Sequence, residues 1–79
     1  MKRDEIFKNL NEIFRDVFDD DEIEVKEETS AADIEDWDSL THITLISAVE
    51  DEFDVKFSMK DVIGMKNVGE MVNIIMEEN

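Results

Sequence analysis

The first stretch of the chain places apolar side chains at spacings of three and four. These positions are Ile6, Leu10, Ile13, Phe14, Val17 and Phe18. Because such residues share one face of a helix, the pattern predicts an amphipathic helix over residues 4–18, with Asp4 as a candidate N-terminal cap. The acidic run at 19–22 is unfavourable at a helix C-terminus, where the dipole disfavours anions, so we expect it to open a loop.

Residues 19–37 contain isolated apolar anchors in place of a periodic pattern. The anchors are Ile23, Val25, Ile34 and Trp37. A loop of this length is unusual in a compact domain and is often functional. Within it, residues 29–33 are candidates for a short capped turn. Trp37 is expected to pack against the loop and the base of the following helix, with direct partner contact as the alternative.

A second helix is predicted to begin at Asp38 or Ser39 and to run to about Asp54. Asp38 is a good cap residue. One apolar stripe is expected to follow it, with Leu45 beside the stripe. The stripe comprises Leu40, Ile43, Ile46, Val49 and Phe53.

Two capping signatures predict the remaining helices. Ser58 with Asp61 resembles a capping box and would open a short helix over 59–63, ended by Gly64 in left-handed geometry. The stretch 55–57 is too short to be more than an extended connector.

Asn67 with Glu70 repeats the capping signature. It predicts a last helix over 68–77. The side chains expected to be buried by this helix are Val68, Met71, Val72 and Ile75.

The elements together predict an all-α fold. It is a small four-helix bundle, with three main helices plus one short helix and a long loop between the first two. The 79 residues suffice for one domain, residues 1–79. Cysteine is absent, which excludes disulfides and thiolate metal sites. No apolar run of signal-peptide or membrane-spanning type is found, so a cytoplasmic location is expected. The chain is also expected to be a monomer.

Charge narrows the choice of partners. The net charge of −15 comes from 23 acidic and 8 basic residues, which disfavours nucleic acid and anionic membranes and favours basic proteins. Residues 31–54 contain acids but no lysine or arginine, whereas 55–79 are nearly balanced. The acids of the first segment are Asp33, Glu35, Asp36, Asp38, Glu50, Asp51, Glu52 and Asp54. Both a solvated helix face and a partner-docking face fit this distribution.

Asp38-Ser39-Leu40 lies at the predicted start of the second helix. A phosphate ester on a hydroxyl there would lie near free backbone N–H groups and the positive end of the helix dipole. On position alone, a simple capping role for Ser39 or Asp38 is the more economical interpretation.

A longer stretch resembles the acyl carrier protein family. It comprises Asp36-Trp37-Asp38-Ser39-Leu40, then Ile43, Leu45, Ile46, Val49 and Glu50-Asp51-Glu52-Phe53. The family's attachment motif is Asp-Ser-Leu at the start of helix two, followed by apolar residues and an acidic cluster ending in Phe. The similarity extends over nearly the whole chain, including its length, acidity and order of helices.

The resemblance implies a carrier that catalyses nothing itself. A phosphopantetheinyl transferase would move 4′-phosphopantetheine from coenzyme A onto Ser39, and the arm's thiol would hold an acyl group as a thioester. Asp38 would assist transferase recognition and its metal site, and Leu40 would supply an apolar contact beside the arm. The other partners implied are acyl-loading, synthase and acyltransferase enzymes with basic docking patches.

The docking residues that the resemblance implies lie along the second and third helices. Ile43 would add an apolar contact beside the arm, and Glu50 and Asp51 would pair with basic partner residues. Exposed ion pairs of this kind contribute about 0–1 kcal/mol each and mainly set speed and register. Ile63 and Met65 are candidate partner or acyl-chain contacts, with core packing as the alternative for Ile63.

Some positions depart from the pattern of many fatty-acid carriers. Asp36 stands where glycine is common, and Thr41, His42 and Thr44 stand where acids are often found. Trp37 before the Asp-Ser-Leu resembles specialised carriers of polyketide, peptide-synthetase or other dedicated pathways, which disfavours housekeeping fatty-acid synthesis.

Other chemistries fit less well. Ser39 and His42 lack the orienting group and oxyanion hole of a hydrolase, so His42 is expected to be an exposed residue that tunes local charge with pH. The acidic run from Asp19 fails as an EF-hand, because its sixth and twelfth positions are Glu24 and Ser30.

The rival hypothesis is an acidic helical adaptor that binds a basic protein without a prosthetic group. It predicts a chain of unmodified mass whose function survives Ser39→Ala.

Overall fold

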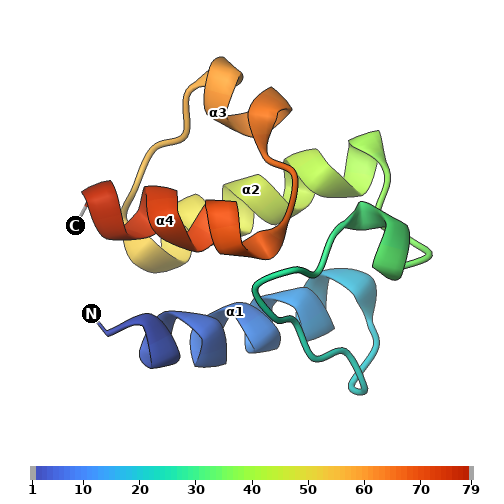
Figure 1. Cartoon of the computed structure of the whole chain (residues 1–79). Helices are drawn as coiled ribbons and strands as arrows, with labels where there is room; N and C mark the ends of the chain where they lie inside the picture. Colours follow the sequence, from blue (N-terminus) through green and yellow to red (C-terminus); the bar gives the residue numbers. More distant parts are fainter. Residues whose placement is uncertain (1, 79) are drawn as a thin grey trace.

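The structure is a computed structural model, which describes residues 2–78 of the chain. Its elements are α1 (Arg3–Phe18), the 3-10 turn η1 (Ala31–Asp33), α2 (Ser39–Phe53), α3 (Met59–Gly64) and α4 (Val68–Glu78). The predicted all-α bundle of three long helices and one short helix is confirmed, and the described part of the chain contains no strand. Figure 1 shows α2 and α4 above α1, α3 across the top, and both chain ends on the same side of the bundle.

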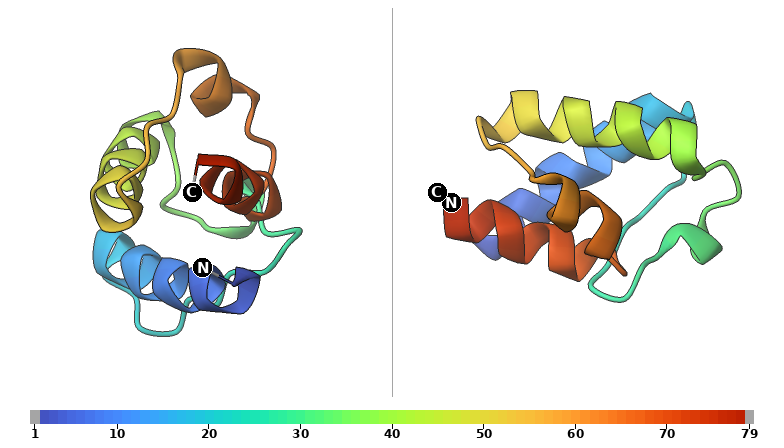
Figure 2. Two further views of the ribbon diagram at one scale, coloured as in Figure 1. Left: turned by 90° about the vertical axis from the view of Figure 1, so that its left-hand side faces the viewer. Right: turned by 90° about the horizontal axis from the view of Figure 1, so that it is seen from above.

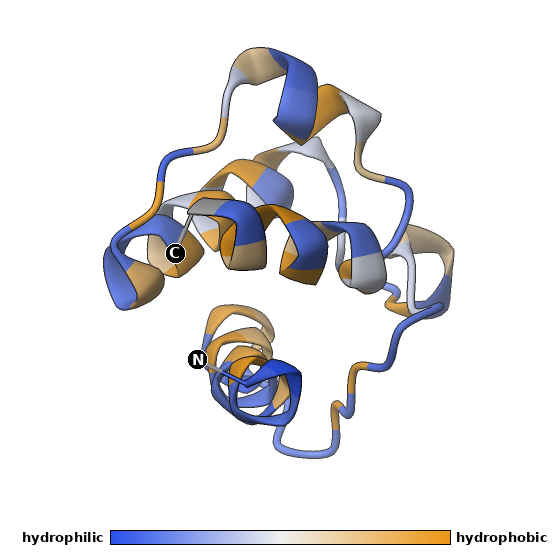
Figure 3. Ribbon diagram, turned by 60° about the vertical axis from the view of Figure 1, so that its left-hand side comes forward, coloured by the Kyte–Doolittle hydropathy of each residue, from blue (hydrophilic) through white to orange (hydrophobic). Residues whose placement is uncertain are grey.

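The core lies between α1, α2 and α4, and the apolar sides of the helices face it (Figure 3). Helix α1 buries Ile6, Leu10, Phe14 and Phe18. The predicted buried set of α4 is confirmed, because all four of its members have an exposed fraction of 0%. Each such side chain contributes about 1.5–3 kcal/mol of burial free energy.

Helix α1 begins one residue earlier than predicted, and the assignment of Asp4 as its cap is wrong. Lys2 occupies the cap position and makes no side-chain capping hydrogen bond. Asp4 lies inside the first turn, where its carboxylate still interacts favourably with the helix dipole. At the other end Asp19 adopts a left-handed conformation, with φ of 51°, and its N–H donates to the Arg15 carbonyl, so the acidic run does open the loop.

Helix α2 begins and ends as predicted, but its expected single stripe is wrong. Leu40 and Ile43 are exposed, whereas Leu45, Ile46 and the later apolar residues are buried. At about 100° per residue, Ile43 is rotated about 60° and Leu40 about 120° from Ile46, away from the side on which Val49 lies. The start of α2 therefore turns its apolar residues toward solvent.

The long loop is anchored as expected. Val25 is buried, while Ile23, Ile34 and Trp37 are half-buried against the core. The predicted short turn is η1, where the Ser30 N–H donates to Asp33 Oδ2 at 2.9 Å.

The same loop also supplies hydrogen-bond partners for the start of α4. The N–H of Val68 donates to the Thr29 carbonyl at 2.8 Å, and that of Gly69 donates to the Glu27 carbonyl at 2.9 Å. These are two of the N-terminal N–H groups that have no partner within the helix. The loop is thereby joined to α4 and lies across the same end of the bundle as the start of α2 (Figure 2).

A salt bridge fastens this contact to α1. The Arg3 guanidinium donates from Nε and Nη2 to the two Glu27 oxygens, each at 2.6 Å. These hydrogen bonds raise the pKa of Arg3 and lower the pKa of Glu27. Arg3 also donates to Asn73 Oδ1 at 2.9 Å, so α1, the loop and α4 meet at one side chain.

Helix α3 has the predicted reciprocal cap. Ser58 Oγ accepts from the Asp61 N–H at 3.1 Å, and Asp61 Oδ2 accepts from the Ser58 N–H at 3.2 Å. The left-handed ending at Gly64 is wrong, because Gly64 is the last helical residue and its φ is not positive. The chain leaves the helix through Met65, whose extended backbone ends the turn without a left-handed residue.

At the start of α4, Asn67 Oδ1 accepts from the Glu70 N–H at 2.9 Å, which confirms the predicted capping signature. The Glu70 carboxylate accepts from Lys66 N at 2.9 Å rather than from Asn67, one residue earlier than a capping box would have it. Among the described helices, none combines the length and the apolar character needed to cross a membrane.

Candidate functional site

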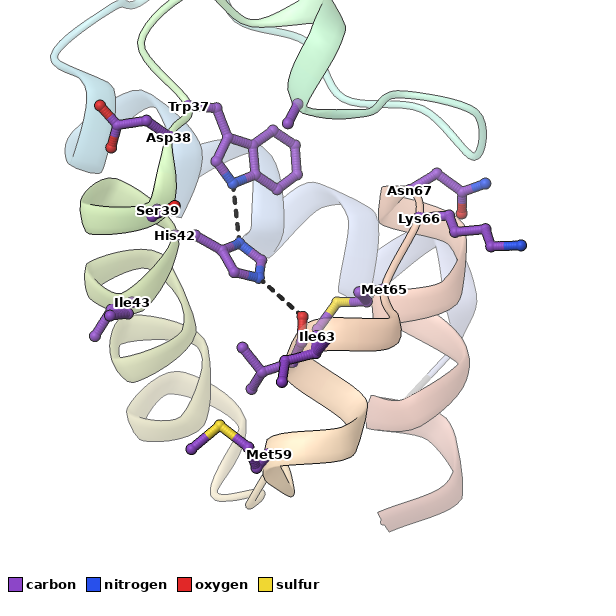
Figure 4. A pocket seen from close by; sticks show the side chains of 12 residues that line it. Trp37, Asp38, Ser39, His42, Ile43, Met59, Ile63, Met65, Lys66 and Asn67 are labelled. Atoms are coloured by element: carbon purple, nitrogen blue, oxygen red, sulfur yellow. Dashed lines mark hydrogen bonds between the residues drawn. The ribbon is translucent and has the colours of Figure 1, made fainter.

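A groove of about 560 Å³ runs between α2 and α3 at the end of the bundle where α2 begins (Figure 4). Its polar side includes Asp38, Ser39, Lys66 and Asn67. Its apolar side includes Ile43, Met59, Ile63 and Met65. The groove therefore brings together Asp38 and Ser39 of the predicted motif with residues of the third helix and the connector after it.

Ser39 is the first residue of α2 and is exposed. Within residues 2–78 its hydroxyl has no hydrogen-bond partner, although backbone N–H groups of the same turn lie beside it. The capping role that position alone suggested belongs to Asp38, whose Oδ1 accepts from the Thr41 N–H at 3.0 Å. The Ser39 hydroxyl is thus available for chemistry without loss of the cap.

Asp38 is held as a carboxylate by its own helix. The Thr41 N–H and then the Thr41 hydroxyl bond to it and lower the pKa of Asp38 below its ordinary value of 3.8. In return the Asp38 N–H donates to Thr41 Oγ1 at 2.8 Å. A negative charge therefore lies next to the Ser39 hydroxyl at neutral pH, and it is exposed to an approaching protein.

Trp37 packs as predicted. Its ring lies edge-on to Phe14 with centroids 5.2 Å apart, and Phe18 is its other aromatic neighbour from α1 at 6.3 Å. The indole N–H donates to His42 Nδ1 at 2.9 Å. Together these contacts fix Trp37, two positions before Ser39, against both α1 and α2.

The expectation that His42 is exposed is wrong. Its ring is half-buried in the groove, and Nε2 lies 3.3 Å from the Val62 carbonyl oxygen of α3. At about 100° per residue, His42 lies about 40° from Ile46 on the core-facing side of α2. This angular position is the signal in the sequence that could have revealed the burial of His42.

The predicted apolar docking residues differ in exposure. Ile43 is 64% exposed and Ile63 is 76% exposed, which excludes core packing for Ile63. Leu40 is also exposed but lies outside the groove lining. Met65 is half-buried against the core and contributes one edge to the groove.

Met59 was not anticipated from the sequence, although it is 75% exposed and lines the groove with Ile63. Its place four residues before Ile63, on the same helix face, is the signal that could have identified it.

The two predicted docking acids also lie differently. Asp51 is exposed, while Glu50 is half-buried and its Oε2 accepts from the Phe57 N–H at 2.8 Å. The hydrogen bond ties Glu50 to the connector between α2 and α3. Asp51 is the acid of this pair whose carboxylate has no such internal bond among the described residues.

Comparison with known proteins gives the class first. A family described as a phosphopantetheine attachment site matches residues 8–75. The acyl carrier protein of Petrotoga mobilis is 36% identical over 78 residues, covering 99% of this chain and 92% of the relative. The meromycolate extension acyl carrier protein of Mycolicibacterium smegmatis is 35% identical over 80 residues, covering 98% of this chain and 81% of the relative.

A solved structure agrees with these sequence matches. The solution structure of a holo acyl carrier protein from Geobacter metallireducens has a TM-score of 0.86 and 42% identity, covering 91% of this chain and 83% of its own. The chain belongs to the acyl carrier protein family.

Membership defines what the chain does in general terms. It is a non-catalytic carrier of phosphopantetheine, served by a phosphopantetheinyl transferase and by biosynthetic enzymes. A free, exposed hydroxyl at the mouth of a groove fits a phosphate ester with a flexible arm. The rival adaptor without a prosthetic group is therefore rejected.

Proposed function

We propose that Ser39 is the residue that bears the phosphopantetheine arm. The observation that carries this proposal is the unpartnered hydroxyl at the first position of α2, beside a cap that Asp38 provides by itself. A phosphate on this oxygen would lie near the N-terminal N–H groups of α2 and the positive end of its dipole. The Asp38 carboxylate beside it would contribute to transferase recognition and to the transferase's metal site.

The transfer is a phosphoryl substitution. The Ser39 oxygen forms a bond to the phosphorus that carries the pantetheine arm of coenzyme A, and the bond from that phosphorus to adenosine 3′,5′-bisphosphate breaks. The serine proton passes to a base of the transferase. The arm, once attached, supplies a terminal thiol that holds acyl groups as thioesters.

Intact-mass spectrometry tests the assignment. The chain is incubated with coenzyme A and a phosphopantetheinyl transferase, and a gain of one phosphopantetheine is expected. Ser39→Ala should abolish the gain, whereas Ser47→Ala should leave it unchanged, because Ser47 is an exposed serine in the middle of the same helix. Full modification of Ser39→Ala would overturn the proposal.

Partner enzymes would dock on the face that surrounds this serine. The exposed apolar side chains of Leu40, Ile43 and Ile63 would make the central contacts, and Met65 would border them. Asp51 would pair with basic residues of the partner. Glu50 would also pair with them, either while keeping its hydrogen bond from the Phe57 N–H or by exchanging that bond for the new pair. Weak, long-range attraction of this kind suits a carrier that must leave each enzyme.

The pathway we favour is a dedicated one, in fatty acid, polyketide or related specialised biosynthesis. This rests on Asp36 and His42, which replace residues common in fatty-acid carriers, and on Trp37, which resembles specialised carriers. Loading assays with acyl-transferring enzymes from the three pathway types would test it, since equal transfer by a housekeeping fatty-acid enzyme would contradict specialisation.

A further inference from the structure

His42 connects three parts of the structure, namely α2, the loop and α3, through one side chain. Its ring projects from α2, accepts a hydrogen bond from Trp37 in the loop, and lies against the Val62 carbonyl of α3 (Figure 4). Both contacts lie in the lining of the groove that begins at Ser39. The Ser39-bearing end of α2 is thus joined to the loop and to α3 by one side chain.

The contacts determine which ring nitrogen carries the proton. An indole N–H is only a donor, so Nδ1 of His42 must accept from Trp37. A neutral imidazole has one proton, which then lies on Nε2 and is donated to the Val62 oxygen at 3.3 Å. Val62 is in the last turn of α3, where carbonyls lack partners within the helix, so His42 satisfies one of them.

Helix α3 has few other constraints. It has six residues and contains no fully buried side chain, and a helix this short is not stable by itself. Its exposed Met59 and Ile63 do not hold it to the core, so within the helix only half-buried Val62 and the bond from His42 do. The flanking residues Phe57 and Met65 are also half-buried against the core. The bond from His42 is therefore one of few contacts that position α3 over the groove.

Protonation would break the bond from Trp37 and keep the bond to Val62. The imidazolium ring carries N–H on both nitrogens, so its Nδ1–H would face the Trp37 N–H and the bond between them would be lost. The charged groups that line the same groove are Asp38 at the α2 cap and Lys66 after α3, and from α1 the rings of Phe14 and Phe18 lie against Trp37.

We propose that His42 is a positioning residue which, in its neutral form, fastens α3 to the Trp37 loop beside Ser39. Its replacement frees α3 from the groove, whereas its protonation releases only the indole of Trp37. This goes beyond the carrier function, because the device exists whether or not Ser39 is modified. It makes the shape of the arm's surroundings dependent on one imidazole.

Two conservative substitutions separate the two bonds. An asparagine amide reaches the place of Nδ1, so His42→Asn keeps an acceptor for Trp37 and loses the donor to Val62. A glutamine amide reaches the place of Nε2, so His42→Gln keeps the donor to Val62 and loses the acceptor. His42→Ala loses both.

Nuclear magnetic resonance of the whole chain reads each bond separately. The chain has one tryptophan, so the indole N–H gives one signal. We expect this signal to move in His42→Gln and His42→Ala but to stay in His42→Asn. Hydrogen exchange of the α3 amides should accelerate roughly 2- to 12-fold in His42→Asn and His42→Ala, and stay near wild type in His42→Gln. Exchange in α1 should not change in any variant, which distinguishes positioning from general destabilisation.

A pH series on the wild-type chain completes the test. As the pH is lowered and the imidazole signals show the ring becoming protonated, the indole signal should move while the protection of α3 stays near its starting value. His42→Ala should show no such movement of the indole signal. A wild-type indole signal that stays constant while the ring becomes protonated would overturn the proposal, as would equal acceleration in α1 and α3 of the variants. The same measurements on Ser39→Ala keep this outcome separate from the attachment assignment.

Discussion

Gly69, in the first turn of α4, has no room for a side chain. A Cβ at this position would lie 2.8 Å from the Glu27 carbonyl oxygen and 2.7 Å from Glu27 Oε1. The carboxylate could move, but the carbonyl belongs to the loop backbone that accepts the Gly69 N–H at 2.9 Å. Gly69→Ala therefore has to push the loop away from α4.

The magnitude follows from opposing contributions. Overpacking costs about 1–3 kcal/mol, and loss of the Gly69 to Glu27 hydrogen bond costs about 0.5–1.5 kcal/mol. Alanine returns up to about 1 kcal/mol through its higher helix propensity. We expect a net loss of about 1–3 kcal/mol in the free energy of unfolding, measured by urea denaturation.

Gly64→Ala is the matched control. Nothing lies within 4 Å of a Cβ built there, its φ is not positive, and it ends a helix, so a gain of up to about 1 kcal/mol is expected. If Gly69→Ala proves as stable as wild type, the loop does not constrain α4 in the way described.

Three further outcomes follow from charge and burial. Lower salt should destabilise the domain, because repulsion within its net charge of −15 extends over a screening length of about 8 Å at 0.15 M but about 30 Å at 0.01 M. A urea midpoint that is the same at these two salt concentrations would contradict this. Because the pKa of Asp38 is lowered in the folded chain, its contribution to stability is complete above its ordinary pKa and is lost as pH falls through its pKa in the folded chain. Asp38→Asn should remove this dependence on acid pH when the free energy of unfolding is measured over a pH series, and an unchanged pH dependence would contradict the reasoning. Leu45→Ala, at a fully buried position, should lower the free energy of unfolding by about 2–5 kcal/mol, whereas Ile63→Ala, at an exposed position, should lower it by under about 0.5 kcal/mol. Ile63→Ala should nevertheless slow acyl transfer by partner enzymes, and the reverse ranking of the two variants in denaturation would refute the burial argument.

Local signals predicted the helices well, because caps act within one turn. Asp38, Ser58 and Asn67 each accept the N–H three residues later, as their spacing suggests. The four apolar residues of α4 are buried because their spacing follows one helix face. The serine motif was likewise readable, since its residues are consecutive in the sequence.

The failures arose where the outcome depends on a neighbouring element. Leu40 and Ile43 carry the right residue type for burial, but α3 is too short to cover them. The angular position of His42 on α2 indicates burial, but its partners come from the loop, five residues before it, and from α3, 20 residues after it, so no local pattern identifies them. The close approach at Gly69 depends on Glu27, which lies 42 residues before it in the sequence.

Both ends of the described chain emerge on the side of the bundle away from the start of α2 (Figure 1). A tag, a surface tether or a neighbouring domain joined at either end would therefore leave the serine end pointing outward. Immobilised carrier should accept its modification as readily as free carrier, which makes the molecule suited to display on a bead or a scaffold.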